Sequence, residues 1–388
     1  MNKLVLKRMF WLSLTMLVIT SCSSSKSKDE LDPPAALVDI TPSLELETVW
    51  QTYIDGYDDE QLDVKLVPAT NSNTLFVASP GGQVIALDSY NGKQVWEVDT
   101  ETEISGGVGI GSGLIVVGTH NGEVIALSDI DGAQLWRVTV SSEILSPPAI
   151  AANVIVVRTI DGKLFGLDPQ AGSIKWVYER TLPILTLRGT SAPVILGGEV
   201  VVAGFDNGKM AVLELATGKL LTERTVVMPT GRTELERMVD IDTTPKVMGD
   251  ALYLTGFQGN TLAMNIFNAE IIWKREIYSF KELAVDSQTV YLVDPQSYVW
   301  ALDRQANGNS IWKQEQFYKR DVTAPASTGE YVVVGDFEGY LHWMASYDGH
   351  VVARYQLSDE RIQATPLVFD NLLIAVDSAG KMVALRFD

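Results

Sequence analysis

Few residues in this chain are spaced so that they could do chemistry. The histidines His120, His342 and His350 form no His-x-x-x-His pattern, and no second cysteine is present to pair with them, so a zinc site is not expected. The one cysteine, Cys22, excludes an internal disulfide. Residues 109–113 are glycine-rich, but a strand-like run follows them instead of a Lys-Ser/Thr helix, which predicts a turn and not a phosphate loop. We therefore expect no catalytic residue, no metal and no cofactor.

The N-terminus has the pattern of a targeting segment. Three basic residues among the first eight precede an apolar run from Met9 to Thr20, which is too short to cross a bilayer. The run ends in Ile19-Thr20-Ser21-Cys22, which resembles the lipobox of bacterial lipoproteins. This resemblance implies a signal peptide of residues 1–21 and lipidation of Cys22, and several acyl chains anchor a protein durably. The alternative is a plain secretory signal with an incidental cysteine.

The residues after the cysteine predict a tether. Serines, lysines, acids and a proline pair dominate residues 23–34, a composition typical of flexible linkers. We place a lipidated flexible tether at 22–43 and a folded domain at 44–388. Ser23, in place of aspartate, implies forwarding to the outer membrane in bacteria of the enteric type. The net charge of −19 argues against nucleic acid as a partner, because phosphate contacts need a basic face.

A repeat of about 40 residues fills the folded domain. Its regular copies read Gly-x-φ-x-Ala-Leu, where φ is apolar, followed by a turn and Gly-x-x-x-Trp. Eight copies align at the φ position: Val84, Val124, Leu164, Met210, Thr261, Val299, Leu341 and Met382. Each copy carries short, turn-bounded strand patterns, and such units must stack to bury their apolar faces. The sequence predicts an all-β, eight-bladed β-propeller of four-stranded, quinoprotein-like repeats.

The ends of the domain predict how the ring closes. The eighth copy stops before its Gly-x-x-x-Trp, and a strand-like run at 45–50 supplies the missing outer strand. Tryptophan occupies six of the eight equivalent positions, with Thr222 and Ala353 at the others: Trp50, Trp96, Trp136, Trp176, Trp273 and Trp312. Repetition at the blade period predicts packing between blades and not a ligand cage.

Two adjacent intervals exceed the period. Leu164 to Met210 is 46 residues and Met210 to Thr261 is 51. Long loops on a rigid repeat are where binding usually occurs. The first contains Leu185, Leu187 and Arg188, and the second Asp240 and Asp242. Two interpretations remain open: a protein-docking patch with an apolar centre and charged rim, or leucines in the core with Arg188 paired to one of the aspartates.

Three segments carry a family resemblance. They read Leu-x-Leu-Arg-Gly-x-Ser-Ala-Pro at 185–193, Asp-x-Asp-Thr-Thr-Pro at 240–245 and Glu-Gly-Tyr-Leu-His-Trp at 338–343. The chain resembles the BamB family, the propeller lipoproteins of the outer-membrane β-barrel assembly (Bam) machinery. The resemblance implies a non-catalytic scaffold, lipid-anchored in the outer membrane and facing the periplasm.

The resemblance also implies partners and a site. Leu185, Leu187, Arg188, Asp240 and Asp242 would dock on the periplasmic POTRA domains of the barrel subunit, BamA. Other Bam subunits would be further partners, and unfolded outer-membrane proteins are candidate substrates.

Two other functions fit the repeat. Pyrroloquinoline-quinone dehydrogenases have similar blades, but they need a calcium site, a general-base aspartate and often a vicinal cysteine pair. This chain has a single cysteine and cannot form such a pair. A propeller could also bind an extended peptide by adding it as a strand to an exposed sheet edge, which is compatible with a scaffold role.

Overall fold

The computed structural model describes residues 32–57, 66–71, 73–180, 191–228, 232, 239–241, 243–257 and 259–387. The chain divides into two compact units, Met1–Pro34 and Ala35–Asp388. In the described parts no helix is long and apolar enough to cross a membrane.

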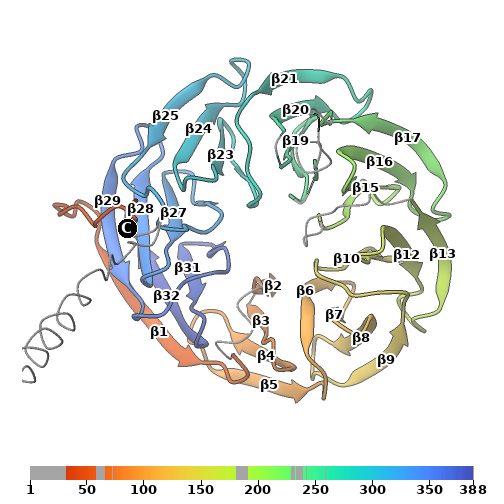
Figure 1. Cartoon of the computed structure of the whole chain (residues 1–388). Coiled ribbons are helices and arrows are strands. Elements are labelled where there is room, and N and C mark those ends of the chain that lie inside the picture. The colour runs from red at the N-terminus through yellow and green to blue at the C-terminus, as the bar shows by residue number, and fades with distance from the viewer. Residues whose placement is uncertain are drawn as a thin grey trace, which may run out of the picture. The chain divides into compact units, whose positions relative to one another are not determined.

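The described residues of the second unit form eight four-stranded antiparallel sheets arranged as the blades of a ring (Figure 1). Blades 1 to 4 are β2 (Ala69–Asn71), β3 (Thr74–Ala78), β4 (Gln83–Asp88) and β5 (Gln94–Asp99); β6 (Ile104–Gly111), β7 (Leu114–Thr119), β8 (Glu123–Ser128) and β9 (Gln134–Thr139); β10 (Ala149–Ile150), β11 (Ile155–Arg158), β12 (Lys163–Leu167) and β13 (Ile174–Glu179); β14 (Val194–Leu196), β15 (Val200–Phe205), β16 (Lys209–Glu214) and β17 (Leu220–Thr225). Blades 5 to 8 are β18 (Lys246–Met248), β19 (Ala251–Thr255), β20 (Thr261–Asn265) and β21 (Ile271–Arg275); β22 (Ala284–Val285), β23 (Thr289–Val293), β24 (Val299–Asp303) and β25 (Ser310–Gln314); β26 (Ala326–Ser327), β27 (Tyr331–Gly335), β28 (Tyr340–Ala345) and β29 (Val351–Gln356); β30 (Leu367–Phe369), β31 (Leu372–Val376), β32 (Lys381–Phe387) and β1 (Leu46–Tyr53). The predicted eight-bladed propeller is confirmed.

The first strand of the domain closes the ring. β1 pairs with β32 in a register from Leu46 opposite Phe387 to Tyr53 opposite Lys381. Figure 1 shows this red N-terminal strand along the outside of the blue C-terminal blade. Closure by a strand from the other end of the chain removes the open edge that β32 would otherwise present, as the sequence predicts.

Tryptophans join six of the eight blades to the next one. The indole of Trp176 packs on Gly218 of blade 4, where an added Cβ would lie 2.5 Å from the ring. Its Nε1–H donates to the carbonyl of Leu215, 2.9 Å away. The same indole-to-carbonyl bond, at 2.8 to 3.3 Å, is made by Trp50, Trp96, Trp136, Trp273 and Trp312. The packing function predicted for these tryptophans is confirmed.

The two positions without tryptophan follow from the same geometry. Blade 4 has Thr222 there, and the turn it would face in blade 5 has Ala269 instead of glycine, so both partners of the contact are missing together. Blade 7 has Ala353, and the blade it faces has no hairpin turn for an indole to pack on, because β32 pairs with β1 and not with a following strand. Its indole is instead Trp343, which stands opposite Ala353 in the sheet and contacts Phe387 with ring centroids 4.9 Å apart.

The second unit begins before its first strand. The backbone amides of Ala35 and Ser43 donate to the carbonyls of Tyr318 and Val352, each at 2.9 Å. Residues 35–43, which the sequence assigned to the tether, therefore hydrogen-bond to blade 7 and to the connection that leads into it.

Candidate partner-binding site

The predicted site falls on two of the longest connections between blades. β13 and β14 are joined by residues 180–193, and β17 and β18 by residues 226–245. Because the strands are antiparallel, these connections leave the blades at the same edge as the hairpins between second and third strands. Another long connection, residues 54–68, joins β1 to β2 where the ring closes. The spacing between repeat copies does not include this connection, because it precedes the first copy.

Most of the predicted site residues lie outside the described residues. These are Leu185, Leu187, Arg188 and Asp242. Asp240 is described, and so are the ends of both connections. The distances and contacts given below therefore describe the base of the site, which we define as the described ends of the two connections and the blade residues that they contact.

Asp240 lies in a buried segment at the end of the second connection. Its side chain is 1% exposed, and Val239 and Ile241 beside it are also buried. Its carbonyl accepts from the amide of Phe257 at 2.8 Å, forming an isolated bridge. Ile241 packs so closely on blade 4 that a Cβ on Gly204 would lie 2.4 Å from it. This end of the connection is thus wedged between blades 4 and 5.

A buried arginine holds the end of the first connection. Arg158, 1% exposed, lies 2.6 Å from the carboxylate of Asp206. Its guanidinium also donates to the carbonyls of Ser191, at 3.4 Å, and Gly204. Ser191 is the first described residue after the loop, so blade 3 fixes the point at which the loop enters blade 4.

A second arginine marks the start of the same loop. Arg180 forms an ion pair with Glu223 of β17, and its guanidinium carbon lies 5.3 Å from the ring centre of Phe205. The guanidinium of Arg158 lies 5.1 Å from the same ring. A hydrogen bond from Lys209, 2.7 Å away, and the ion pair with Arg180 lower the pKa of Glu223. Both ends of the loop are therefore attached to charged groups around one aromatic ring.

Sequence reasoning missed Arg158, although a signal for it exists. At the equivalent position the other blades have small or uncharged residues, such as Ala78, Gly118, Gly204 and Val293. A lone charged residue in a column of core positions needs a buried partner, and Asp206 is that partner.

The described residues suggest no metal chemistry. Among them, no group of three or more histidines, cysteines, aspartates or glutamates could hold an ion. His120 pairs with Glu143, and His342 with Asp336 inside blade 7. Both histidines thus have structural partners.

The fold and the joining tryptophans define the class of protein: an eight-bladed, quinoprotein-like β-propeller. A family model described as "Outer membrane protein assembly factor BamB" matches residues 47–103 and 80–314. A curated relative of that name from Kangiella koreensis is 46% identical over 372 residues, covering 96% of this chain and 95% of its own. The crystal structure of BamB from Moraxella catarrhalis is similar with a TM-score of 0.80 at 27% identity, covering 88% of this chain and all of the other. The chain belongs to the BamB family.

A quinohemoprotein alcohol dehydrogenase from Comamonas testosteroni is also similar in structure. Its TM-score is 0.70 at 12% identity, covering 88% of this chain and 76% of the enzyme. At that identity the likeness shows a shared propeller fold alone.

Proposed function

We propose that this protein is a non-catalytic scaffold subunit of the Bam complex that aids assembly of proteins into the outer membrane. It is anchored there through lipid on Cys22 and faces the periplasm. Membership of a family of outer membrane protein assembly factors supports this function.

The partner in this proposal is the POTRA region of BamA. Four residues form the docking surface and make the direct contacts, Leu185, Leu187, Arg188 and Asp242, and the buried Asp240 supports the connection that carries Asp242. The observation that carries the proposal is the attachment of both ends of the 180–193 connection to a buried base, through Arg180 and through the bond from Arg158 to Ser191. A loop fixed at both ends loses less conformational entropy when it binds, which favours affinity. The leucines would enter an apolar cleft, and charge pairing would set orientation.

Asp240 has a different function in this proposal from the other four residues. Its side chain is buried at the base, so we assign it to supporting the connection, whereas direct contacts come from the loop residues. Substituting it would lower both stability and binding, whereas substituting Leu187 would lower binding alone.

Co-purification of the Bam complex tests this function. We expect Leu187→Ala with Arg188→Ala to reduce recovery of BamA with the tagged mature protein. A matched control is Leu221→Ala with Arg224→Ala, which removes the same residue types from exposed positions on β17. Undiminished recovery with the first variant would reject the docking surface, and dye-linked dehydrogenase activity with bound quinone would favour an enzyme.

One observation favours a second candidate function, the binding of extended peptides. The outer strands pair on one side only and expose apolar side chains from the residue before the tryptophan position, which is occupied by Thr222 in blade 4. These are Val95, Leu135, Leu221, Ile272 and Ile311, each 46 to 56% exposed. Such edges suit strand addition by an unfolded substrate. Protection of the β5, β9 and β25 amides by a barrel-strand peptide would support this function.

A further inference from the structure

The segment before β1, residues 35–44, is bound through its backbone to blade 7 and to the connection that leads into it. At its two ends, the amides of Ala35 and Ser43 bond to the carbonyls of Tyr318 and Val352. Ile40 packs against the cluster between blades 6 and 7, and Leu44, 5% exposed, is part of the cluster between blades 7 and 8. Two packed apolar side chains and a backbone hydrogen bond at each end indicate a bound segment.

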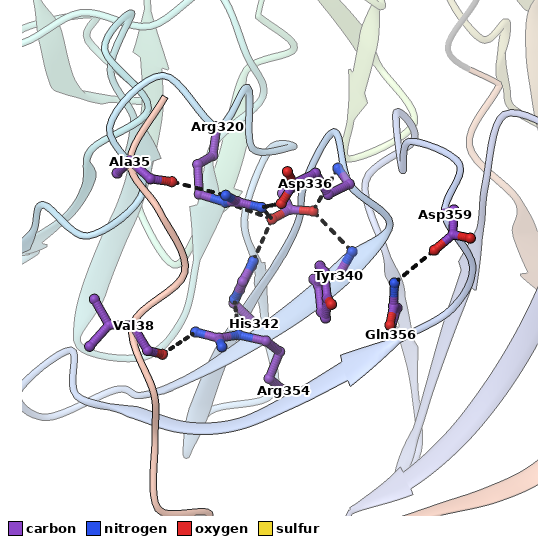
Figure 2. A network of polar contacts seen from close by, with 10 residues as sticks. Ala35, Val38, Arg320, Asp336, Tyr340, His342, Arg354, Gln356 and Asp359 are labelled. Carbon is purple, nitrogen blue, oxygen red and sulfur yellow. Dashed lines mark hydrogen bonds and ion pairs between the residues drawn. The ribbon is translucent and has the colours of Figure 1, made fainter. Parts of the chain in front are cut away.

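The first residue of this segment is held by a buried arginine. Arg320, whose side chain is 2% exposed, donates to the carbonyl of Ala35 at 2.9 Å. Its other nitrogens donate to the carboxylate of Asp336 at 2.8 and 2.6 Å. Because Asp336 is fully buried, the guanidinium is fixed in direction before the segment binds. Figure 2 shows Arg320 between Ala35 and Asp336.

A second arginine holds the middle of the segment. Arg354 of β29 donates to the carbonyl of Val38 at 3.2 Å, and its Nε–H donates to Nδ1 of His342, also at 3.2 Å. Nε2 of His342 lies 2.8 Å from the Asp336 carboxylate. Since Nδ1 accepts a bond, the ring is neutral and carries its proton on Nε2. Asp336 therefore orients both arginines, one directly and one through His342, as Figure 2 shows.

We propose that blade 7 carries a binding site for residues 35–44 of its own chain, and that Arg320 and Arg354 act there as positioning residues that make this segment a fixed strap. The strap ends the flexible tether at Pro34 instead of at residue 43. The site recognises mainly backbone carbonyls and two apolar side chains, so Val38, whose side chain is 52% exposed, contributes its carbonyl only.

The strap limits how far the propeller can move from a lipid anchor, a consequence that rests on the proposed lipidation of Cys22. The tether predicted from the sequence would then comprise residues 23–34, twelve residues, which span at most about 40 Å when extended. A tether that continued through residue 43 would have 21 residues and would reach about 70 Å. The strap therefore shortens the predicted tether by nine residues and its maximum reach by about 30 Å.

Hydrogen exchange of the purified mature protein in detergent tests the strap without any partner. We expect the amides of Ala35 and Ser43 to exchange at least about 10-fold more slowly than those of residues 23–32. Arg354→Ala should raise exchange within 35–43 by about 3- to 10-fold, because one hydrogen bond is lost. Leu44→Ser should do the same, while Val38→Ser and the blade 8 control Arg386→Ala should not.

Equal exchange of the two segments in the wild-type protein would overturn the strap. If the segment is protected but its exchange rate does not change in the Arg354→Ala variant, Arg354 is not a positioning residue. Neither result depends on BamA, so failure of the docking proposal and failure of the strap are distinguishable.

Discussion

Arg158 at the end of β11 and Asp206 after β15 form an ion pair at 2.6 Å across the boundary between blades 3 and 4. The two side chains are 1% and 5% exposed. Because both charges are buried, the attraction within the pair matters less for stability than the uncompensated charge that removal of one partner would leave behind. This boundary is also where the 180–193 connection enters blade 4.

Removing Arg158 alone should strongly destabilise the propeller. We expect Arg158→Ala to cost about 3–5 kcal/mol, because Asp206 is left buried without its cation. The double variant Arg158→Met with Asp206→Leu should recover much of that loss. Arg386→Ala, which breaks an exposed pair with Glu47, should cost at most about 1 kcal/mol. Urea unfolding of all variants measures the differences, and equal losses for Arg158 and Arg386 would contradict a buried pair.

Gly218 should be sensitive to a single methyl group. It has φ of +69°, and its Cβ would clash with Trp176 at 2.5 Å. Gly249 has φ of +62° with nothing within 4 Å. We expect Gly249→Ala to cost about 1 kcal/mol through backbone strain, and Gly218→Ala about 1–3 kcal/mol more through the clash. Thermal unfolding distinguishes the two variants. Identical melting temperatures would contradict the clash and show that the Trp176 indole shifts to make room for the methyl group.

His342 should make stability depend on pH. Burial lowers the pKa of His342, although a bond to Asp336 opposes this, and the neighbouring charges Arg354 and Arg320 lower it further. The unfolded chain therefore binds a proton near pH 6.5 that the folded chain does not yet bind. The stability contributed by neutral His342 is complete above about pH 6.5 and is lost as the pH falls toward the folded pKa.

The variant His342→Gln isolates this contribution. Its unfolding free energy should vary less between about pH 5 and 7 than that of the wild-type protein, because no proton is taken up on unfolding at this position. His350→Gln, at an exposed turn, is the matched control and should keep the wild-type slope. Parallel curves for wild type and His342→Gln would contradict a neutral buried imidazole.

The sequence predicts the ring because its determinants repeat. Glycine and tryptophan at fixed spacing reveal both the blades and the closing strand at Trp50. The sequence does not predict that in blade 7 the indole comes from Trp343 on the third strand, opposite Ala353 on the outer strand. The repeat spacing marks only the outer-strand position and carries no information about the facing strand. The strap could not be predicted from the sequence for another reason. Arg320 donates to the backbone carbonyl of Ala35, and a backbone acceptor is present in every residue type.

The site is predicted less completely than the fold. Interrupted periodicity identifies the two connections, but their bases depend on pairs distant in sequence, such as Arg158 with Asp206, 48 residues apart. The burial of Asp240 is likewise a property of the folded chain that composition does not reveal.

Titration of the purified mature protein with the POTRA domains of BamA measures whether the 180–193 connection is the docking surface. Leu187→Ala should weaken binding about 5- to 150-fold, corresponding to about 1–3 kcal/mol, without lowering the unfolding temperature. Leu221→Ala should bind like the wild-type protein. Equal dissociation constants for Leu187→Ala and wild type would contradict docking through the 180–193 connection.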